Sequence, residues 1–485
     1  MEKPEYLAEG ETARLIPVIA DTRNEQRAVS VLLAVLAVVP EFSRALLGPL
    51  GHRLNQRSVV NTYTEVVFKN QKDAPKDRPD GLIVVNSGKR KWTALVEAKI
   101  GKARLDQDQV ERYLKLARVN GIDAVVTISN AFATIPTHHP LEISGKLTQR
   151  VNLFHLSWRH ILTEAIILHS RVVIEDTEQK YLLREFIRFL SSDSAGVTGF
   201  TAMPSEWKEI VNTILAGGRL TPSTHGLESI IASWHQEMRD VALQMGQAVG
   251  RQVDVKLTRS HAQSQEQRVK DGVKLLCDKN QMVVVLEVPD AASEITVVAD
   301  VRARALRASM TLDAPKDIKR GVARVRWLLR QLKDADATGV TIRLLWPSRA
   351  ADSVFTLGQL RDDESIINEG SSAKAPRAFE VTLNCDSRGH FSGRKTFIKD
   401  LERLVPDFYE RIGEHLKAWI PSPPKIKVKS EAAPTPAEEA RPSPQAKTEP
   451  ETGAGGEQST PRPAIFQIGN RPDELLDIPP FLRRT

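Results

Sequence analysis

Two acidic residues and one lysine are closely spaced within the first hundred residues of the chain. Asp80 stands in the string Arg78-Pro-Asp-Gly, and Glu97 and Lys99 stand two residues apart in Leu95-Val-Glu-Ala-Lys. Carboxylate oxygens suit Mg²⁺, and a bound metal lowers the pKa of a coordinated water. A lysine beside the metal can orient or deprotonate that water and offset the charge that develops at phosphorus. These residue types are therefore the parts that hydrolysis of a phosphodiester requires.

The neighbouring elements should bring the three side chains to one edge of a sheet. The apolar runs 81–85 and 92–96 are separated by an Asn-Ser-Gly turn signal, which predicts two strands joined by a tight turn. Asp80 precedes the first strand. Side chains two residues apart share a face of a strand, so Glu97 and Lys99 project together. We therefore expect Asp80 to lie beside both of them.

Further patterns predict an α/β fold for the first third of the chain. Helical periodicity indicates helices, and apolar or alternating runs indicate strands. The expected helices are 24–39 and 105–118, and the expected additional strands are 62–68, 124–128 and 151–156. The resulting element order is α-β-β-β-α-β, which describes a compact core with the acidic residues and the lysine near its strand ends.

These residues resemble the PD-(D/E)xK nuclease superfamily, whose core is restriction-endonuclease-like. Pro79-Asp80 followed by Glu97-Ala98-Lys99 is similar to its signature, and Gln109-Val-Glu-Arg-Tyr113 resembles the QxxxY motif of its RecB-like branch. The resemblance implies that Asp80, Glu97 and the carbonyl of Ala98 bind Mg²⁺ or Mn²⁺. It also implies that Lys99 activates the attacking water, and that Gln109 and Tyr113 support the site or contact DNA.

Other acidic and histidine residues have open or weaker assignments. The resemblance implies that Glu25, on the first helix, is a further metal ligand. Glu65 is either an additional ligand or part of a solvated strand face, since it lies on the expected strand 62–68. His138 and His139 lie in a proline-rich loop without the spacing of a metal site, so we expect them at the surface.

Composition predicts a cytoplasmic protein of several parts. The chain has 485 residues, of which 41% are apolar and 27% charged, and its net charge of +7 is compatible with nucleic acid as a partner. No expected helix is long enough to span a membrane, and the polar N-terminal segment does not read as a signal peptide. The expected organisation is a nuclease-like domain (1–190), a linker (191–226), a second α/β domain (227–420), a disordered proline-rich linker (421–470) and a partner-binding peptide (471–485).

Basic residues are dense in the second α/β domain. Lys316, Arg320 and Arg324 recur every four residues on an expected helix over 317–332, which would form one basic stripe. Such a stripe could follow the phosphates of a nucleic acid. The alternative is an ordinary solvated helix face balanced by nearby aspartates.

The end of the chain has a different character. The last 65 residues contain 13 of the 28 prolines, and few large apolar residues occur there before Ile465. Such a stretch buries too little apolar surface to offset chain entropy, so we expect disorder. The terminal string Leu476-Asp-Ile-Pro-Pro-Phe-Leu-Arg-Arg resembles the C-terminal peptide of the bacterial division tubulin FtsZ. This resemblance implies a partner for residues 473–485 among the division proteins that bind such tails.

The expected function is that of a bacterial metal-dependent endo- or exodeoxyribonuclease, acting in defence against foreign DNA or in DNA repair. DNA is the expected substrate, and RNA fits the same chemistry. The alternative is a catalytically inactive nucleic-acid-binding or interaction protein that is linked to the division machinery through its tail.

Overall fold

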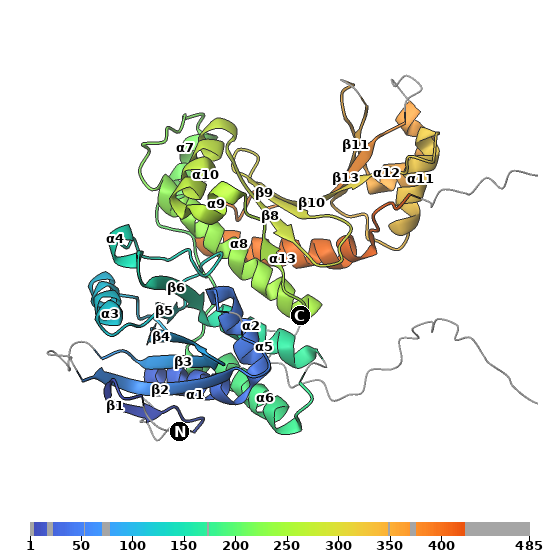
Figure 1. Ribbon diagram of the computed structural model, residues 1–485. Coiled ribbons are helices and arrows are strands. Elements are labelled where there is room, and N and C mark those ends of the chain that lie inside the picture. Colours follow the sequence, from blue (N-terminus) through green and yellow to red (C-terminus); the bar gives the residue numbers. More distant parts are fainter. Residues whose placement is uncertain are drawn as a thin grey trace, which may run out of the picture. The chain divides into compact units, whose positions relative to one another are not determined.

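The structure is a computed structural model (Figure 1). It describes residues 4–16, 23–52, 54–69, 78–171, 174–347, 350–368 and 375–421. Met1–Pro421 form one compact unit. Its described residues form a mixed α and β fold around one mixed sheet and one antiparallel sheet. The expected disordered linker (421–470) and terminal peptide (471–485) lie outside the described residues, apart from Pro421.

The first sheet has six strands in the order of the sequence, β1 to β6. Strands β1 to β4 pair antiparallel, whereas β5 and β6 continue the sheet parallel to β4. A parallel pairing requires a crossover, which α3 (Gln107–Val119) supplies between β4 and β5. The strands are β1 (Leu7–Thr12), β2 (Val59–Phe68), β3 (Gly81–Ser87), β4 (Arg90–Ala98), β5 (Ala124–Ser129) and β6 (Asn152–Ser157).

Helices cover both faces of this sheet. One apolar core joins the first face to α1, α2, α5 and α6. A second core joins the opposite face to α3, whose Val110, Tyr113 and Leu114 pack with Leu82 and Leu95 of the sheet. The helices of the first face are α1 (Asn24–Val38), α2 (Pro40–Leu47), α5 (Trp158–Ser170) and α6 (Thr177–Ser191).

The alternation of side chains along β4 decides where its acidic residue lies. Ala94, Val96 and Ala98 belong to the core beneath α1, whereas Leu95 belongs to the core beneath α3. Because successive side chains of a strand point to opposite faces, Glu97 lies on the same side as Leu95. Glu97 is only 1% exposed, so this carboxyl group is held at the buried end of a central strand.

The expected helices and strands between residues 24 and 157 are confirmed, with small shifts at their ends. The elements β1, α2 and the short helix α4 (Gly145–Thr148) were not expected. β1 is a largely exposed edge strand in which only Leu7 is buried, so no apolar alternation marks it in the sequence. α2 begins at Pro40, directly after α1, and this proline at the first helical position was the available signal of a new helix.

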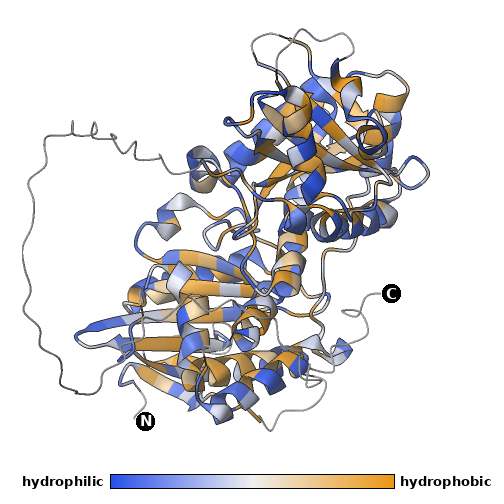
Figure 2. Cartoon of the chain, turned by 90° about the vertical axis from the view of Figure 1, so that its right-hand side faces the viewer, coloured by the Kyte–Doolittle hydropathy of each residue, from blue (hydrophilic) through white to orange (hydrophobic). Residues whose placement is uncertain are grey.

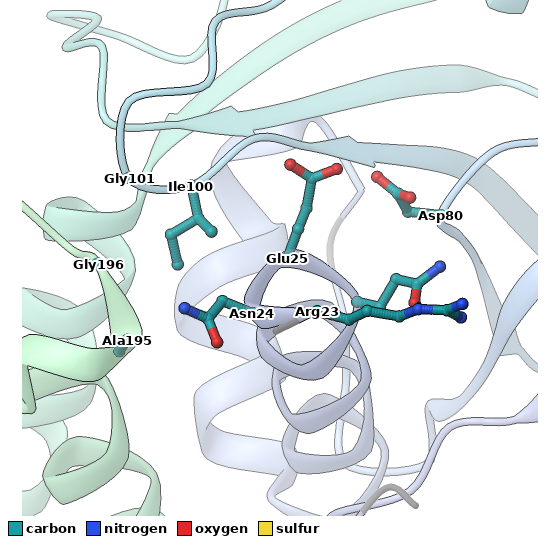
Figure 3. Close-up of a pocket in the computed structure, with 9 residues that line it drawn as sticks. Arg23, Asn24, Glu25, Asp80, Ile100, Gly101, Ala195 and Gly196 are labelled. Carbon is teal, nitrogen blue, oxygen red and sulfur yellow. The ribbon is translucent and has the colours of Figure 1, made fainter. Parts of the chain in front are cut away.

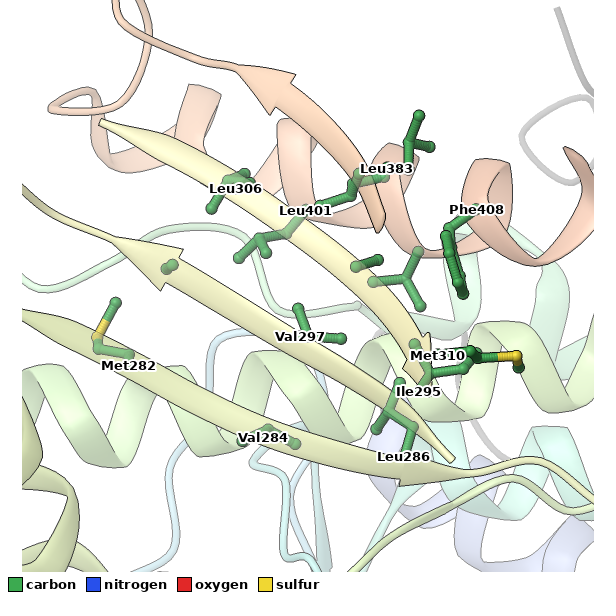
Figure 4. Packing of buried hydrophobic residues seen from close by; sticks show 14 of the residues in the cluster. Met282, Val284, Leu286, Ile295, Val297, Leu306, Met310, Leu383, Leu401 and Phe408 are labelled. Atoms are coloured by element: carbon green, nitrogen blue, oxygen red, sulfur yellow. The ribbon is translucent and has the colours of Figure 1, made fainter. Parts of the chain in front are cut away.

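The second sheet has seven strands, and all of its pairings are antiparallel. Figure 4 shows Leu401 and Phe408 of α13 (Arg394–Arg411) among the apolar side chains of the sheet. α8 (Leu227–Val249) contributes to the same core. The strand order is β12 (Ser353–Thr356), β11 (Val340–Leu345), β13 (Ala378–Asp386), β10 (Ala305–Asp313), β9 (Ile295–Asp300), β8 (Gln281–Glu287) and β7 (Asp254–Val255).

The segment 191–226 differs from the linker that its Ser, Thr and Gly content indicated. It contains α7 (Trp207–Leu215), an amphipathic helix whose apolar face is buried in the core of the second sheet. Trp207 is fully buried, and its Nε1 donates a 2.9 Å hydrogen bond to the carbonyl of Phe391. Figure 2 shows how apolar residues gather between the sheets and helices. The apolar face of α7 is therefore part of the second core, although it lies within the expected linker.

The basic stripe expected over 317–332 does not form. α11 (Gly321–Gln331) begins after Lys316 and Arg320, so these residues do not share its face with Arg324. The guanidinium of Arg324 instead donates to two backbone carbonyls outside the helix, at 2.6 and 2.8 Å. The helix begins four residues later than its expected start at residue 317. Lys316, Arg320 and Arg324 therefore do not form one basic face that could follow the phosphates of a nucleic acid.

No single helix in the described ranges is long and apolar enough to cross a membrane. α1 reaches such a length only together with Pro40–Leu50, and the two parts are bent by 111° relative to each other. The apolar residues of α1 are buried in the core of the first sheet.

Candidate active site

The pairing of β3 with β4 brings Asp80 to the end of β4. Gly81 pairs with Val96 in the antiparallel register, so the residue before Gly81 lies level with the last residues of β4. The amide of Ala98 donates a 2.8 Å hydrogen bond to Oδ2 of Asp80. The expected approach of Asp80 to the Glu-Ala-Lys segment is therefore present in the geometry.

Lys99 is at the centre of the acidic group. Its ammonium donates to Oε1 of Glu97 at 2.5 Å, to Oε1 of Glu25 at 3.0 Å and to the carbonyl of Ala98 at 3.1 Å. The Lys99 side chain is 17% exposed and that of Glu97 is 2% exposed. Little water screens this ion pair, so the charges interact more strongly than a surface pair would.

The backbone of Lys99 is held on both sides. Its amide donates to the carbonyl of Ile128 in β5 at 2.8 Å. Its carbonyl accepts a 3.0 Å hydrogen bond from Nε1 of Trp158, a fully buried residue at the start of α5. Sequence reasoning did not single out Trp158, because a tryptophan at a helix start carries no signal of a distant backbone partner.

Close packing of α1 against β3 brings Glu25 to the site. A Cβ atom on Gly81 would lie 2.5 Å from Cδ1 of Leu33 in α1 and 3.2 Å from the carbonyl of Tyr63. A Cβ at this position would therefore force the buried Leu33 side chain to move, so the glycine favours close packing of α1 on β3. The glycine after Asp80 thus allows the first turn of α1, with Glu25, to reach Lys99.

Gln109 and Tyr113 support the segment that precedes Asp80. Nε2 of Gln109 donates to the hydroxyl of Tyr113 at 3.0 Å, and that hydroxyl donates to the carbonyl of Arg78 at 3.0 Å. Tyr113 is 1% exposed, so the bond is formed inside the core beneath α3. The geometry favours a supporting role for this pair over direct contact with a substrate.

The carboxyl groups of the site hold protons more tightly than usual. Burial raises the pKa of Asp80 well above its ordinary value, and the neighbouring Glu97 carboxylate raises it further. Burial also raises the pKa of Glu97, although the Lys99 ammonium opposes this. Burial lowers the pKa of Lys99, but Glu97 and the other carboxylates outweigh it and raise the net value, so Lys99 stays protonated.

A pocket of about 450 Å³ opens beside these groups. Asp80 and the first turn of α1 form one side of it, and Figure 3 shows the carboxyl groups of Asp80 and Glu25 pointing into the same space. Ala195 and Gly196 form the opposite wall. The side chain of Asn130 fixes that wall, since its Nδ2 donates to the carbonyl of Gly196 at 2.8 Å. Neither Asn130 nor the wall was expected from the sequence.

The oxygen atoms present fit a hard divalent cation. Asp80, Glu97 and the carbonyl of Ala98 meet at one strand end, and Oε2 of Glu97 is buried without a hydrogen-bond partner among the described residues. Within those residues, no group of three or more His, Cys, Asp or Glu side chains could hold a metal. The set at the strand end is therefore two carboxylates with a carbonyl, and Glu25 lies beside it, bonded to the same Lys99 ammonium as Glu97 and the Ala98 carbonyl.

Glu65 is a partly exposed strand residue whose carboxylate contacts two neighbouring side chains. Its Oε1 accepts a hydrogen bond from Gln26 at 2.9 Å, and its Oε2 pairs with Nε of Arg78 at 3.0 Å. Both oxygens are thus engaged with neighbouring side chains.

The expectation that the two loop histidines lie at the surface is wrong. His138 is 5% exposed, and Nε2 of His139 lies 2.9 Å from the hydroxyl of Thr127. The same hydroxyl lies 2.8 Å from Nδ1 of His155. Burial lowers the pKa of His139 to about 4 and that of His155 to about 3, so both are neutral at physiological pH. They form a neutral network around Thr127 of β5, the residue that pairs with Glu97 in the sheet.

Comparison with protein-family models gives no match for this chain, and comparison with curated protein sequences gives none either.

Proposed function

We propose that the first part of the chain is a metal-dependent nuclease with a restriction-endonuclease-like core, formed by α1, β2, β3, β4, α3 and β5. The observation that carries the proposal is the convergence of Asp80, Glu97 and Lys99 at one strand end, with the Ala98 amide bound to Asp80. Supporting it, Gln109 and Tyr113 brace the Asp80 segment from α3. The pocket beside these groups gives a substrate access to them.

Asp80, Glu97 and the carbonyl of Ala98 would hold Mg²⁺ or Mn²⁺. When bound, the metal supplies a water of lowered pKa and neutralises charge on the phosphate. Lys99 remains an ammonium ion beside Glu97, so its role is to fix a positive charge near the developing negative charge and to orient the nucleophilic water. Glu25 keeps that ammonium in place through its 3.0 Å ion pair.

The test is a plasmid-nicking assay with the full chain in Mg²⁺, Mn²⁺ and EDTA. Wild type should nick DNA with either metal and be inactive in EDTA. Lys99→Ala should be inactive in all three, with binding of DNA retained. A wild-type protein that binds DNA or RNA yet cuts neither with any divalent metal would overturn the enzyme proposal in favour of a catalytically inactive binding protein.

The biological setting is a further proposal. DNA is the proposed substrate, with defence against foreign DNA or repair as its use and the cytoplasm as its place. The terminal peptide 473–485 is proposed to dock on a protein partner, with division proteins that bind FtsZ-type tails as the first candidates. These proposals rest on the sequence alone, because the peptide lies outside the described residues.

A further inference from the structure

Four polar side chains form a continuous row beside the pocket, which we call the arginine row. Nη1 of Arg23 lies 3.5 Å from Oε1 of Gln26, and Nε2 of Gln26 donates to Oε1 of Glu65 at 2.9 Å. Oε2 of Glu65 pairs with Nε of Arg78 at 3.0 Å. The row therefore has an arginine at each end and a Gln–Glu link in the middle, and it runs from the start of α1 to the segment before Asp80.

The backbone at Glu65 is unusual for its residue type. Its φ is +54°, in the left-handed region that disfavours side chains with a Cβ. The amides of Glu65 and Val66 donate to the successive carbonyls of Asp80 and Pro79, at 3.2 and 3.3 Å. The pairing of β1 with β2 also changes register here, as at a β-bulge. Bulges re-aim a side chain, and this one turns Glu65 toward Gln26 and Arg78.

Charge explains why such a row is useful at this pocket. Asp80, Glu97 and Glu25 place three carboxyl groups around a single ammonium, that of Lys99. The Lys99 ammonium and a divalent metal would together only balance these three carboxylates. The phosphates on either side of the scissile phosphate would find no surplus positive charge at the site, so they need cations of their own.

The two arginines have the exposure and position for that task. Arg23 lines the pocket, and the side chain of Arg78 is 43% exposed although it is paired with Glu65 at 3.0 Å and with Glu9 at 3.8 Å. A guanidinium is planar and can bind a phosphate with two parallel hydrogen bonds, and a carboxylate partner limits its rotation.

We propose that Arg23 and Arg78 bind the phosphates that flank the scissile phosphate of a DNA strand, and that Glu65 is the positioning residue that aims Arg78. This inference rests on the proposed nuclease function, because it takes the substrate to be a phosphodiester chain. It assigns to Arg23 and Arg78 the task of holding the DNA strand across the carboxylates that would bind the metal.

Binding can be measured without cleavage, with a short fluorescein-labelled DNA duplex and the full chain in EDTA over a series of salt concentrations. Arg23→Ala and Arg78→Ala should each weaken binding equally for unrelated sequences and make the plot of log affinity against log salt shallower by about 1. Arg188→Ala is the matched control, since Arg188 is 51% exposed and pairs with Glu185 on α6. The proposal is overturned if either row variant keeps the wild-type slope, or if Arg188→Ala loses as much.

Two variants of Glu65 separate positioning from folding. Glu65→Gly removes the carboxylate and suits the left-handed backbone, so it should unfold at the wild-type temperature or above it. It should raise KM for cleavage and leave kcat nearly unchanged, because the metal-binding carboxylates are untouched. Glu65→Gln has a single side-chain oxygen, which can accept from Gln26 or from Arg78. It should therefore show a smaller rise in KM than Glu65→Gly. A lower kcat at unchanged KM in Glu65→Gly would contradict the positioning role.

The failure of this inference and the failure of the nuclease proposal are distinguishable. If wild type binds DNA with the expected salt slope, and the arginine variants bind with a shallower one, the row stands even if no metal supports cleavage. If wild type cleaves DNA while the arginine variants keep both slope and KM, the nuclease proposal stands and the row fails.

Discussion

The amide of Ala98 donates a 2.8 Å hydrogen bond to Oδ2 of Asp80, so the two strands that carry the proposed metal ligands are joined at the site itself. The bond uses one oxygen of the carboxylate and fixes its orientation. Asp80, directly before β3, and Ala98, at the end of β4, therefore cannot separate without breaking a partly buried hydrogen bond. The site is therefore organised before any metal or substrate arrives.

Asp80→Asn should separate this structural role from the chemical one. The asparagine oxygen can still accept the Ala98 amide, whereas the negative charge is lost. We expect DNA cleavage to fall roughly a hundredfold or more, as for loss of one electrostatic group in other active sites. Thermal unfolding should be unchanged or shifted upward, because a buried carboxyl with a raised pKa is replaced by a neutral group. Asp80→Ala is the comparison, and it should lose both stability and cleavage.

Cleavage and metal binding should increase with pH. The pKa values of Asp80 and Glu97 are raised in the folded chain, so protons compete with the metal at pH values above the ordinary carboxyl range. Metal affinity should therefore be low where both groups are protonated, rise as pH passes through the raised values and level off above them. Titration calorimetry with Mn²⁺ at several pH values would show proton release on binding. Affinity that does not change with pH above the ordinary carboxyl range would contradict the assignment.

Removal of the terminal peptide should leave the chemistry intact. The proposed site lies within residues 23–196, and residues 473–485 lie outside the described part of the chain. Deletion of 473–485 is expected to abolish pull-down of a division protein that binds FtsZ-type tails, while plasmid nicking stays at the wild-type rate. Pull-down that survives the deletion would refute the docking role of this peptide.

The site could be predicted from the sequence where its residues lie on adjacent strands. Asp80, Glu97 and Lys99 are separated by one short turn, so strand alternation alone indicates that they meet. Glu25 could not be placed in this way, because its position depends on how closely α1 packs on Gly81. Its expected role as a ligand stays a prediction, because its bond to Lys99 is one that Glu97 also makes.

Long-range contacts account for most of what the sequence did not show. Trp158 and Asn130 hold the site through backbone carbonyls that lie 59 and 66 residues away along the chain. No local pattern marks such a partner. The polar loop that carries His138 was also misjudged, because its composition resembles that of a surface loop. Its side chains are nevertheless buried by contacts such as the 3.2 Å approach of His138 Nε2 to the carbonyl of Ala262.

Glu237 on α8 should be the clearest stability determinant that has no part in the chemistry. Glu237 is 0% exposed, and neither carboxyl oxygen has a hydrogen-bond partner among the described residues. Burial raises its pKa well above the ordinary value, and the nearby Asp240 and Glu402 carboxyls raise it further. The folded chain thus binds this proton more tightly than the unfolded chain does. The contribution of Glu237 to the free energy of unfolding should be greatest below the ordinary pKa of glutamate. It should fall as pH rises from that value to the raised pKa of the folded chain.

Glu237→Gln removes the ionisable group at nearly constant volume. We expect it to raise the free energy of unfolding at neutral pH, because the buried amide is neutral at every pH whereas the buried carboxyl must be protonated or carry an unpaired charge. The difference from wild type should shrink as pH falls toward the ordinary carboxyl value, where the wild-type side chain is neutral in both states. Urea unfolding of the two proteins across this pH range measures it, with Glu237→Ala as the variant that leaves a cavity instead. A glutamine variant that is less stable than wild type at neutral pH would show that the carboxylate is satisfied in the folded chain.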